Sequence, residues 1–300
     1  MGSVEDVAAE GDTFNPLYRE SAYCAACHYQ VVNEGTLIYN SFGEWLASPY
    51  SDPETGRTCQ DCHMPVAPPH KGRFEGVYNA IDWLEENAGG ELPGPLSVLA
   101  ARSDRNFFVL PEKGGQYRDP EEVHLHDMPG VSDEIFMRNA VAMDLTSRSH
   151  NGELVVQARV MNKGAGHHIP TGSPLRQMFL VIEATDASGA PLTLKQGGAL
   201  PEWAVDLAGA PGKAFAKVLR DELTGEEPTY AHWRTVVIAE DTRIPARATD
   251  ISSYTFAAPE NGPVTVRARL VFRRSPLDLQ QWKGWDDPDM ILAEKELVIE

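Results

Sequence analysis

The sequence predicts an α+β protein of two domains, a small and mostly helical or irregular domain over residues 1–137 followed by an antiparallel β-sandwich over residues 138–300. Three observations lead to this fold class. Short amphipathic segments separated by proline and glycine fill the first part. In the second part apolar and polar residues alternate with a period of two, which is typical of strands with one buried face. The length of 300 residues matches about two domains.

Four helices are expected in the first part. Residues 36–48 repeat apolar side chains at three- and four-residue spacing, and residues 78–87 form a second candidate that Gly89-Gly90 ends. Pro95 opens a third candidate over 95–102. Ser132, Asp133 and Glu134 provide an N-cap and an acidic first turn for a fourth helix, through about residue 142.

Strands are expected throughout the second part. Two runs alternate most regularly, with apolar residues at Leu154, Val156, Ala158 and Val160 and again at Val264, Val266, Ala268, Leu270 and Phe272. Further candidates cover residues 178–184, 192–194, 236–239, 253–256 and 291–299, and a turn is expected at 186–189. Several strands at this spacing predict an immunoglobulin-like sandwich.

The four cysteines form two copies of one motif. Cys24-Ala25-Ala26-Cys27-His28 and Cys59-Gln60-Asp61-Cys62-His63 are both Cys-x-x-Cys-His, the attachment signature of c-type haem. Two thiols three positions apart on one turn can add to the two vinyl groups of a haem edge, and the adjacent histidine then lies under the iron. A four-thiolate zinc site is one alternative, but it does not require a histidine after each pair. A redox dithiol is another, but it needs a strand before the helix, and neither motif follows a convincing strand. The sequence therefore predicts two covalently attached haem c groups, with His28 and His63 as proximal iron ligands.

Haem attachment to such motifs takes place outside the cytoplasm, so we expect an exported protein that is periplasmic or extracellular. The first residues are neither a basic nor an apolar signal region, and we interpret Met1-Gly2-Ser3 as a remnant of expression on a mature chain. No apolar run approaches the roughly 18 residues that suggest a membrane span.

The net charge of −18 counts against nucleic acid as a partner. Residues 1–137 hold 8 basic and 23 acidic residues, net −15, whereas residues 138–300 hold 18 and 21, net −3. The acidity therefore lies on the half that carries the motifs. It serves solubility, and it favours a basic redox partner through long-range steering that salt weakens.

Five short segments stand out along the chain. They are Trp45–Tyr50 (WLASPY), Cys59–Pro65 (CQDCHMP), His126–Gly130 (HDMPG), Gly166–Gly172 (GHHIPTG) and Asp241–Pro245 (DTRIP). Together they resemble segments of the bacterial multihaem c-type cytochromes. The HDMPG segment has methionine where the family usually has an aromatic residue, whereas GHHIPTG matches the family's GHxxPTG pattern in full. The resemblance implies electron transfer, His126 and His167 as distal iron ligands, and a β domain that docks the protein to a partner or to other copies of itself.

Other histidines compete for the distal positions. His70 lies in a stiff Pro-Pro-His loop seven residues after His63, and His124 shares a face with His126 in an extended chain. His168 is adjacent to His167, although the family places the ligand directly after the glycine. Residues alone do not decide among these candidates.

The leading functional interpretation is a dihaem electron carrier with bis-histidine ligation of both irons. One alternative is a dihaem peroxidase or small-molecule reductase in which one iron lacks a sixth protein ligand. Another is a subunit of a larger extracellular cytochrome assembly, to which His70 or His232 would donate a ligand for another copy.

Overall fold

The computed structural model describes residues 15–32, 35–65, 128–259 and 261–300. The chain divides into two compact units that are interleaved along the sequence. The first comprises Met1–Cys24 and Arg57–Pro129, and the second comprises Ala25–Gly56 and Gly130–Glu300. The predicted domain boundary at residues 137 and 138 falls within the second unit and stays a prediction. Among the described residues, no helix has the length and apolar character needed to cross a membrane.

In the first unit, two short helical segments are described. The 3-10 helix η1 (Pro16–Arg19) follows Asn15, whose side-chain oxygen accepts a hydrogen bond from the Leu17 amide at 3.0 Å. Helix α3 (Cys59–His63) begins after Thr58. Helix α1 (Ala22–His28) starts in the first unit and continues into the second. The first and second cysteine motifs therefore lie on α1 and α3.

The N-terminal part of the second unit contains a hairpin and a helix. Strands β1 (Gln30–Val32) and β2 (Thr36–Tyr39) pair antiparallel, and helix α2 (Ser41–Leu46) and the 3-10 helix η3 (Pro49–Ser51) follow. The predicted helix over 36–48 is thus wrong over its first turn. Thr36 and Ile38 are β-branched residues that suit a strand, and Ile38 is fully buried against Leu219 and Val236.

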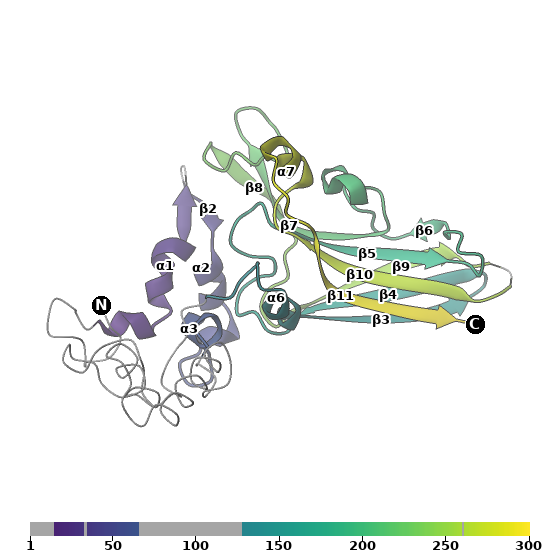
Figure 1. The fold of residues 1–300 in the computed structure, drawn as a ribbon, viewed down its shortest axis with the longest axis horizontal. Helices are drawn as coiled ribbons and strands as arrows, with labels where there is room; N and C mark the ends of the chain where they lie inside the picture. Colours follow the sequence, from purple (N-terminus) through teal and green to yellow (C-terminus); the bar gives the residue numbers. More distant parts are fainter. Residues whose placement is uncertain (1–14, 33–34, 66–127, 260) are drawn as a thin grey trace, which may run out of the picture. The chain divides into compact units, whose positions relative to one another are not determined.

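Two antiparallel sheets form the rest of the second unit (Figure 1). One has the order β3-β4-β9-β6 and the other β11-β10-β5-β7-β8. The strands are β3 (Val141–His150), β4 (Glu153–Asn162), β5 (Gln177–Thr185), β6 (Leu194–Gln196), β7 (Gly212–Asp221), β8 (Val236–Asp241), β9 (Thr249–Ala257), β10 (Val264–Arg273) and β11 (Met290–Ile299). The additional helices are α6 (Glu134–Ala140), the 3-10 helix η6 (Glu202–Leu207) and α7 (Leu277–Lys283).

The main core lies between the two sheets. The alternating residues Leu154, Val156, Ala158 and Val160 of β4 are all fully buried there, as are Val266, Ala268 and Leu270 of β10. Strand β5 is buried on both faces, because Phe179 and Val181 pack on its other side against Leu200 and Ala204. That double burial explains why the sequence of β5 is a continuous apolar run without alternation.

Most of the strand predictions are confirmed. Strands β4, β5, β8, β9, β10 and β11 lie over or around the expected ranges, and β6 overlaps its expected range at Leu194. Asn151 and Gly152 have φ of 51° and 75° in the turn that joins β3 to β4, a conformation that favours these two residue types. The fourth expected helix begins after Asp133, whose carboxylate caps it, and ends at Ala140. The mixture of helices and antiparallel sheets confirms an α+β protein, and the immunoglobulin-like topology stays a prediction. The helices expected at 78–87 and 95–102 lie outside the described residues.

Candidate haem site

The second motif lies on one well-capped helical turn. The Thr58 hydroxyl accepts a hydrogen bond from the Asp61 amide at 3.2 Å, and the Asp61 carboxylate accepts one from the Thr58 amide at 2.7 Å. This reciprocal capping box satisfies two amides that a helix start otherwise leaves unpaired. Because residues three apart lie on the same side of a helix, the capped turn brings Cys59 and Cys62 to one face.

His63 closes this turn and its ring is already oriented. Its Nδ1 lies 2.8 Å from the backbone oxygen of Pro129. A carbonyl oxygen can only accept, so Nδ1 carries the proton and the neutral ring keeps its lone pair on Nε2. Histidines that bind metals are commonly held in this way by a hydrogen bond from the other nitrogen.

The first motif occupies α1 with the same internal spacing. Cys24 and Cys27 lie three residues apart on the helix, and His28 is its last residue. Cys27 is exposed and Cys24 is half-buried. The Tyr29 amide still donates to the Ala25 carbonyl at 3.0 Å, so the helical turn extends past the histidine. Both motifs thus present two thiols and a terminal histidine from one helical segment.

Within the first unit, α3 is tied to the chain that leads into α1. The buried Ser21 accepts hydrogen bonds from the Cys24 amide at its carbonyl oxygen (3.0 Å) and from the Cys59 amide at its hydroxyl (2.9 Å). Gln60 donates from its side chain to the carbonyl oxygens of Tyr18 and Glu20 at 3.0 and 2.9 Å. These contacts bring the first cysteines of the two motifs together, and the Cys24 and Cys59 side chains are hydrogen-bonded.

The two thiols of the second motif differ in acidity. The hydrogen bond with Cys24 lowers the pKa of Cys59 to about 6 against the opposing effect of burial, and Ser21 adds to the lowering. Burial raises the pKa of Cys62. Cys59 is therefore mainly a thiolate at neutral pH, and the thiolate is the reactive form of cysteine.

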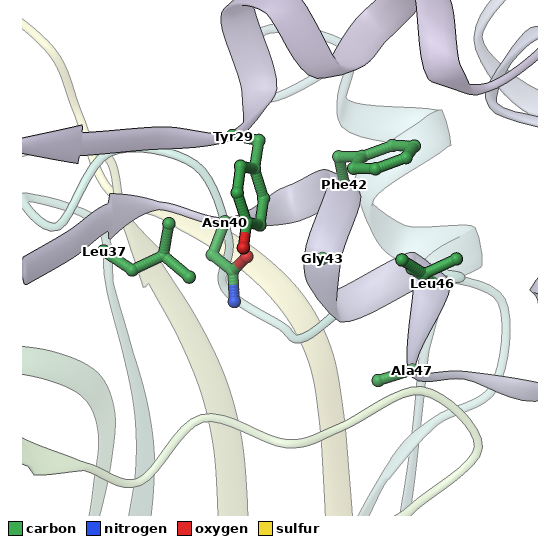
Figure 2. Close-up of a pocket in the computed structure, with 7 residues that line it drawn as sticks. All are labelled: Tyr29, Leu37, Asn40, Phe42, Gly43, Leu46 and Ala47. Atoms are coloured by element: carbon green, nitrogen blue, oxygen red, sulfur yellow. The ribbon is translucent and has the colours of Figure 1, made fainter. Parts of the chain in front are cut away.

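A mostly apolar hollow of about 340 Å³ lies in the second unit close in sequence to His28. Figure 2 shows its lining by Tyr29, Leu37, Asn40, Phe42, Gly43, Leu46 and Ala47. The rings of Tyr29 and Phe42 meet edge to face with centroids 6.2 Å apart. A Cβ at Gly43 would clash with the Asn40 Oδ1 and the Tyr29 ring, so a larger residue here would have to displace these two side chains.

These residues fit a c-type haem. Each motif supplies two thiols on one face and a histidine at the end of the same turn. The His63 Nδ1 is hydrogen-bonded to a backbone carbonyl, as is common for histidines that bind metals through Nε2. The hollow that begins at Tyr29, the residue after His28, is lined mostly by apolar side chains, as cofactor pockets usually are. Cys24, Cys27, Cys59 and Cys62 would form the thioethers.

Of the predicted distal ligands, His167 is described and His126 lies outside the described residues, as do His70 and His124. The carbonyl oxygen of His167 accepts a hydrogen bond from the fully buried Asn162 at 2.7 Å, and its Nδ1 lies 2.9 Å from the His168 carbonyl oxygen. By the same argument as for His63, the neutral ring keeps its lone pair on Nε2.

His168 has a different environment, which separates it from its neighbour. Its Nδ1 lies 3.8 Å from the Glu44 carboxylate, and among the described residues this buried nitrogen has no hydrogen-bond partner. Burial lowers the pKa of His168 against the attraction of Glu44, so the ring is neutral at neutral pH. The two adjacent histidines therefore face different surroundings.

A buried cluster of charges surrounds His168, and sequence reasoning missed it. Arg243 donates from Nη1 to Glu44 Oε1 at 2.7 Å, and its Nε and Nη2 both bind the Asp241 carboxylate at 2.7 Å. Glu44 Oε2 also accepts from the Thr171 hydroxyl at 2.6 Å and from the His168 amide at 3.2 Å. The side chains of Glu44 and Arg243 are only 2% and 5% exposed.

The same cluster connects to the N-terminal hairpin. The Lys217 ammonium donates to the carbonyl oxygens of Leu37 and Ile38 at 3.3 and 3.0 Å. Burial, with repulsion from Arg243, lowers the pKa of Lys217 to about 8. The Thr36 hydroxyl donates to the Val236 carbonyl at 2.7 Å. Residues from α2 and β2 are thus held to the sandwich by polar contacts as well as by apolar packing.

One feature of the sequence could have revealed this cluster, because its residues lie in or directly beside three of the segments that resemble the multihaem cytochromes. Glu44 immediately precedes the WLASPY segment, His168 and Thr171 belong to GHHIPTG, and Asp241 and Arg243 belong to DTRIP. The segments also meet through packing, because Gly166 lies against the Trp45 and Tyr50 side chains and the Arg247 guanidinium stacks over the Tyr50 ring at 4.7 Å. Three segments that are far apart in the sequence therefore form one contact region.

No family model and no curated protein match this chain. The crystal structure of a penta-haem cytochrome c552 from Thermochromatium tepidum superposes with a TM-score of 0.62 and 21% sequence identity, over 96% of this chain and 58% of that chain. The chain has the fold of a multihaem cytochrome c. It spans less than two thirds of the length of that cytochrome.

Two other solved structures show weaker likeness. The Fcho1 mu homology domain of Danio rerio has a TM-score of 0.21 and 8% identity, covering 55% of this chain and 44% of that chain. The PapD-like domain 7 of human CEP192 has a TM-score of 0.21 and 10% identity, covering 53% and 82%.

Proposed function

We propose that this protein is an exported dihaem c-type cytochrome that transfers single electrons. Haem c would be attached at Cys24 and Cys27 and at Cys59 and Cys62. The geometry of the second motif carries the proposal. Its two thiols share a capped helical turn, and His63 is hydrogen-bonded through Nδ1 to the Pro129 carbonyl. The fold shared with a penta-haem cytochrome supports it.

A bound haem c supplies an iron that alternates between the ferrous and ferric states. The chain provides attachment, orientation and the surrounding field. Its cysteines fix the ring to α1 and α3, and the Pro129 carbonyl sets the tautomer and direction of His63. Tyr29 and Phe42 provide an apolar wall beside the first motif.

We also propose His28 and His63 as proximal ligands and His126 and His167 as distal ligands, which gives bis-histidine ligation. His167 is supported over His168 by its geometry, because its Nδ1 is bonded to a backbone carbonyl whereas the His168 ring lies beside Glu44. Closing both iron positions favours electron transfer over chemistry on a bound substrate.

The β part would form an immunoglobulin-like domain that docks the protein to a redox partner or to other copies of the chain. A basic partner suits the net charge of −15 over residues 1–137. Because haem c is attached outside the cytoplasm, we propose a periplasmic or extracellular location.

Haem content tests the attachment. The protein is matured in a host that attaches haem c, and its intact mass and pyridine haemochrome spectrum are measured. Two haems per chain are expected, with Cys59→Ala/Cys62→Ala and Cys24→Ala/Cys27→Ala each retaining one. A colourless protein whose mass equals that of the polypeptide would refute the proposal.

Carbon monoxide tests the ligation. The reduced protein is expected to keep its visible spectrum when the gas is added, because all axial positions are filled. A clear shift at one haem of the wild-type protein would instead indicate the open iron site of a peroxidase or reductase. His167→Ala is expected to make one haem responsive to carbon monoxide, and an unchanged low-spin spectrum would remove His167 from the ligand set.

A further inference from the structure

Glu44 is the centre of the contacts that hold the segment of residues 166–172. It lies on α2, more than 120 positions away in the sequence, and its side chain is 2% exposed. One carboxylate oxygen accepts from the His168 amide and the Thr171 hydroxyl, and the other pairs with Arg243. Ser41 on the same helix lies 3.0 Å from the Thr171 hydroxyl. Helix α2 thus contacts both ends of the His168–Thr171 stretch.

These contacts continue to the ring of His167. Glu44 holds the amide of His168, and the carbonyl oxygen of the same His168 accepts the hydrogen bond from the His167 Nδ1. On the other side, Asn162 holds the His167 carbonyl oxygen. The direction of the His167 ring therefore depends on the position of residue 168. Glu44 holds that residue through its amide, and the backbone bridge between Ile169 and Ile244 holds the next residue.

The energetics of the buried Glu44–Arg243 pair agree with a role in positioning residues 168–171 more than with a role in stability. Removing two charges from water costs about as much as their attraction returns, so such pairs add little net stability compared with apolar residues. Arg243 compensates the Glu44 charge, and together with the hydrogen bond from Thr171 it lowers the pKa of Glu44 despite burial. Glu44 is consequently an anion, and each of its two oxygens accepts from a defined donor. A hydrophobic side chain at this position would leave these donors without an acceptor.

We propose that Glu44 is a positioning residue for the iron ligand His167: its carboxylate fixes residues 168–171 and so presents the His167 Nε2 for coordination. This inference rests on the proposed function, in which His167 is a distal ligand. It adds to that function the group that sets the ligand's orientation.

The test uses the haem-loaded full chain with Glu44→Gln, which preserves shape and removes the charge. In the reduced protein we expect one of the two haems to become responsive to carbon monoxide, while the haem count stays at two. In the ferric protein added imidazole is expected to restore the low-spin spectrum of that haem, because it fills the vacated position. A general loss of packing would not be reversed by imidazole.

Arg273 offers a matched control in the same unit. Its side chain is 1% exposed, and it binds the Asp206 and Asp289 carboxylates and the Ala204 carbonyl rather than residues 166–172. Asp289→Asn is therefore expected to leave both haems low-spin and unresponsive to carbon monoxide. If Glu44→Gln does not accumulate, Thr171→Val is the second variant, because it removes the hydroxyl that donates to Glu44 at nearly constant shape. It is expected to give the same response in a fraction of the molecules.

The outcomes separate this inference from the proposed function. If His167→Ala opens an iron site and neither Glu44→Gln nor Thr171→Val does, the positioning role of Glu44 is wrong and the ligand assignment stands. If His167→Ala leaves both haems low-spin, the ligand assignment fails and the positioning role fails with it. A carbon monoxide response in Asp289→Asn equal to that in Glu44→Gln would also overturn the inference.

Discussion

Glu44 and Arg243 are 199 residues apart in the chain, yet the Arg243 Nη1 lies 2.7 Å from the Glu44 Oε1 in a site that excludes water from both side chains. The pair joins α2 to the residues that follow β8. Since Arg243 also binds Asp241 with Nε and Nη2, each of its three nitrogens donates to a carboxylate. Several consequences of this arrangement and of the cysteine motifs can be measured.

Arg243→Met is expected to lower the free energy of unfolding by roughly 3–5 kcal/mol, because it leaves the Glu44 carboxylate buried without its counter-charge. Adding Glu44→Leu to Arg243→Met should cost less than the sum of the single changes, with a coupling of about 0.5–3 kcal/mol. Urea denaturation of the four proteins measures both quantities. Arg274→Met, at the more exposed pair with Asp287, is the control and should cost less than about 1 kcal/mol. Strict additivity at Glu44 and Arg243 would contradict the prediction.

Stability is expected to fall in acid through Glu44 and Asp241. Arg243 lowers the pKa of both carboxyls despite their burial, so each takes up a proton less readily when folded than when unfolded. Their contribution is fully present above the unfolded pKa values of about 4.3 and 3.9, and it is lost as the pH falls through the folded-state values. Urea midpoints between pH 7 and pH 3 measure the loss. Glu44→Gln should flatten the acid side of this curve, and parallel curves for the two proteins would count against the assignment.

In the chain before haem attachment, Cys59 is expected to be the more reactive thiol of the second motif. Its alkylation should reach half of its maximal rate near pH 6, while Cys62 should react only at higher pH because burial raises its pKa. Iodoacetamide labelling followed by peptide mass analysis gives the two profiles. Cys24→Ala removes the main hydrogen bond and should move the Cys59 profile to higher pH. An unshifted profile in that variant would show that Cys24 does not set the acidity of Cys59.

Gly166→Ala is expected to destabilise the protein by about 1–3 kcal/mol through overpacking. The added Cβ would lie 3.2 Å from the Trp45 ring and 3.3 Å from the Tyr50 ring, so these side chains must move. Thermal unfolding of the variant measures the loss. Combining it with Trp45→Phe, which shortens one of the two rings, should recover part of the stability. If the double variant is less stable than either single variant, crowding against Trp45 is not the cause.

The strands show where pattern reasoning succeeds and where it fails. Strands β4 and β10 alternate strictly, and their apolar positions face the core as expected. Strand β7 carries Lys213, Lys217 and Arg220, so its pattern is not recognisably that of a buried strand, although Lys217 is 5% exposed. The neighbouring hairpin provides carbonyl acceptors for this ammonium, and a local sequence pattern does not contain that compensation.

Two features can be recognised from local sequence alone: the two Cys-x-x-Cys-His motifs, which predict haem attachment, and the period of the strands. Each depends on residues within one turn or one strand. The approach of Cys24 to Cys59, the bond from His63 to the Pro129 carbonyl and the burial of Glu44 beside Arg243 arise only in the folded chain. Each of these contacts joins residues that are far apart in the chain. Their energies depend on the path of the backbone between them and on the exclusion of water, which no local propensity encodes.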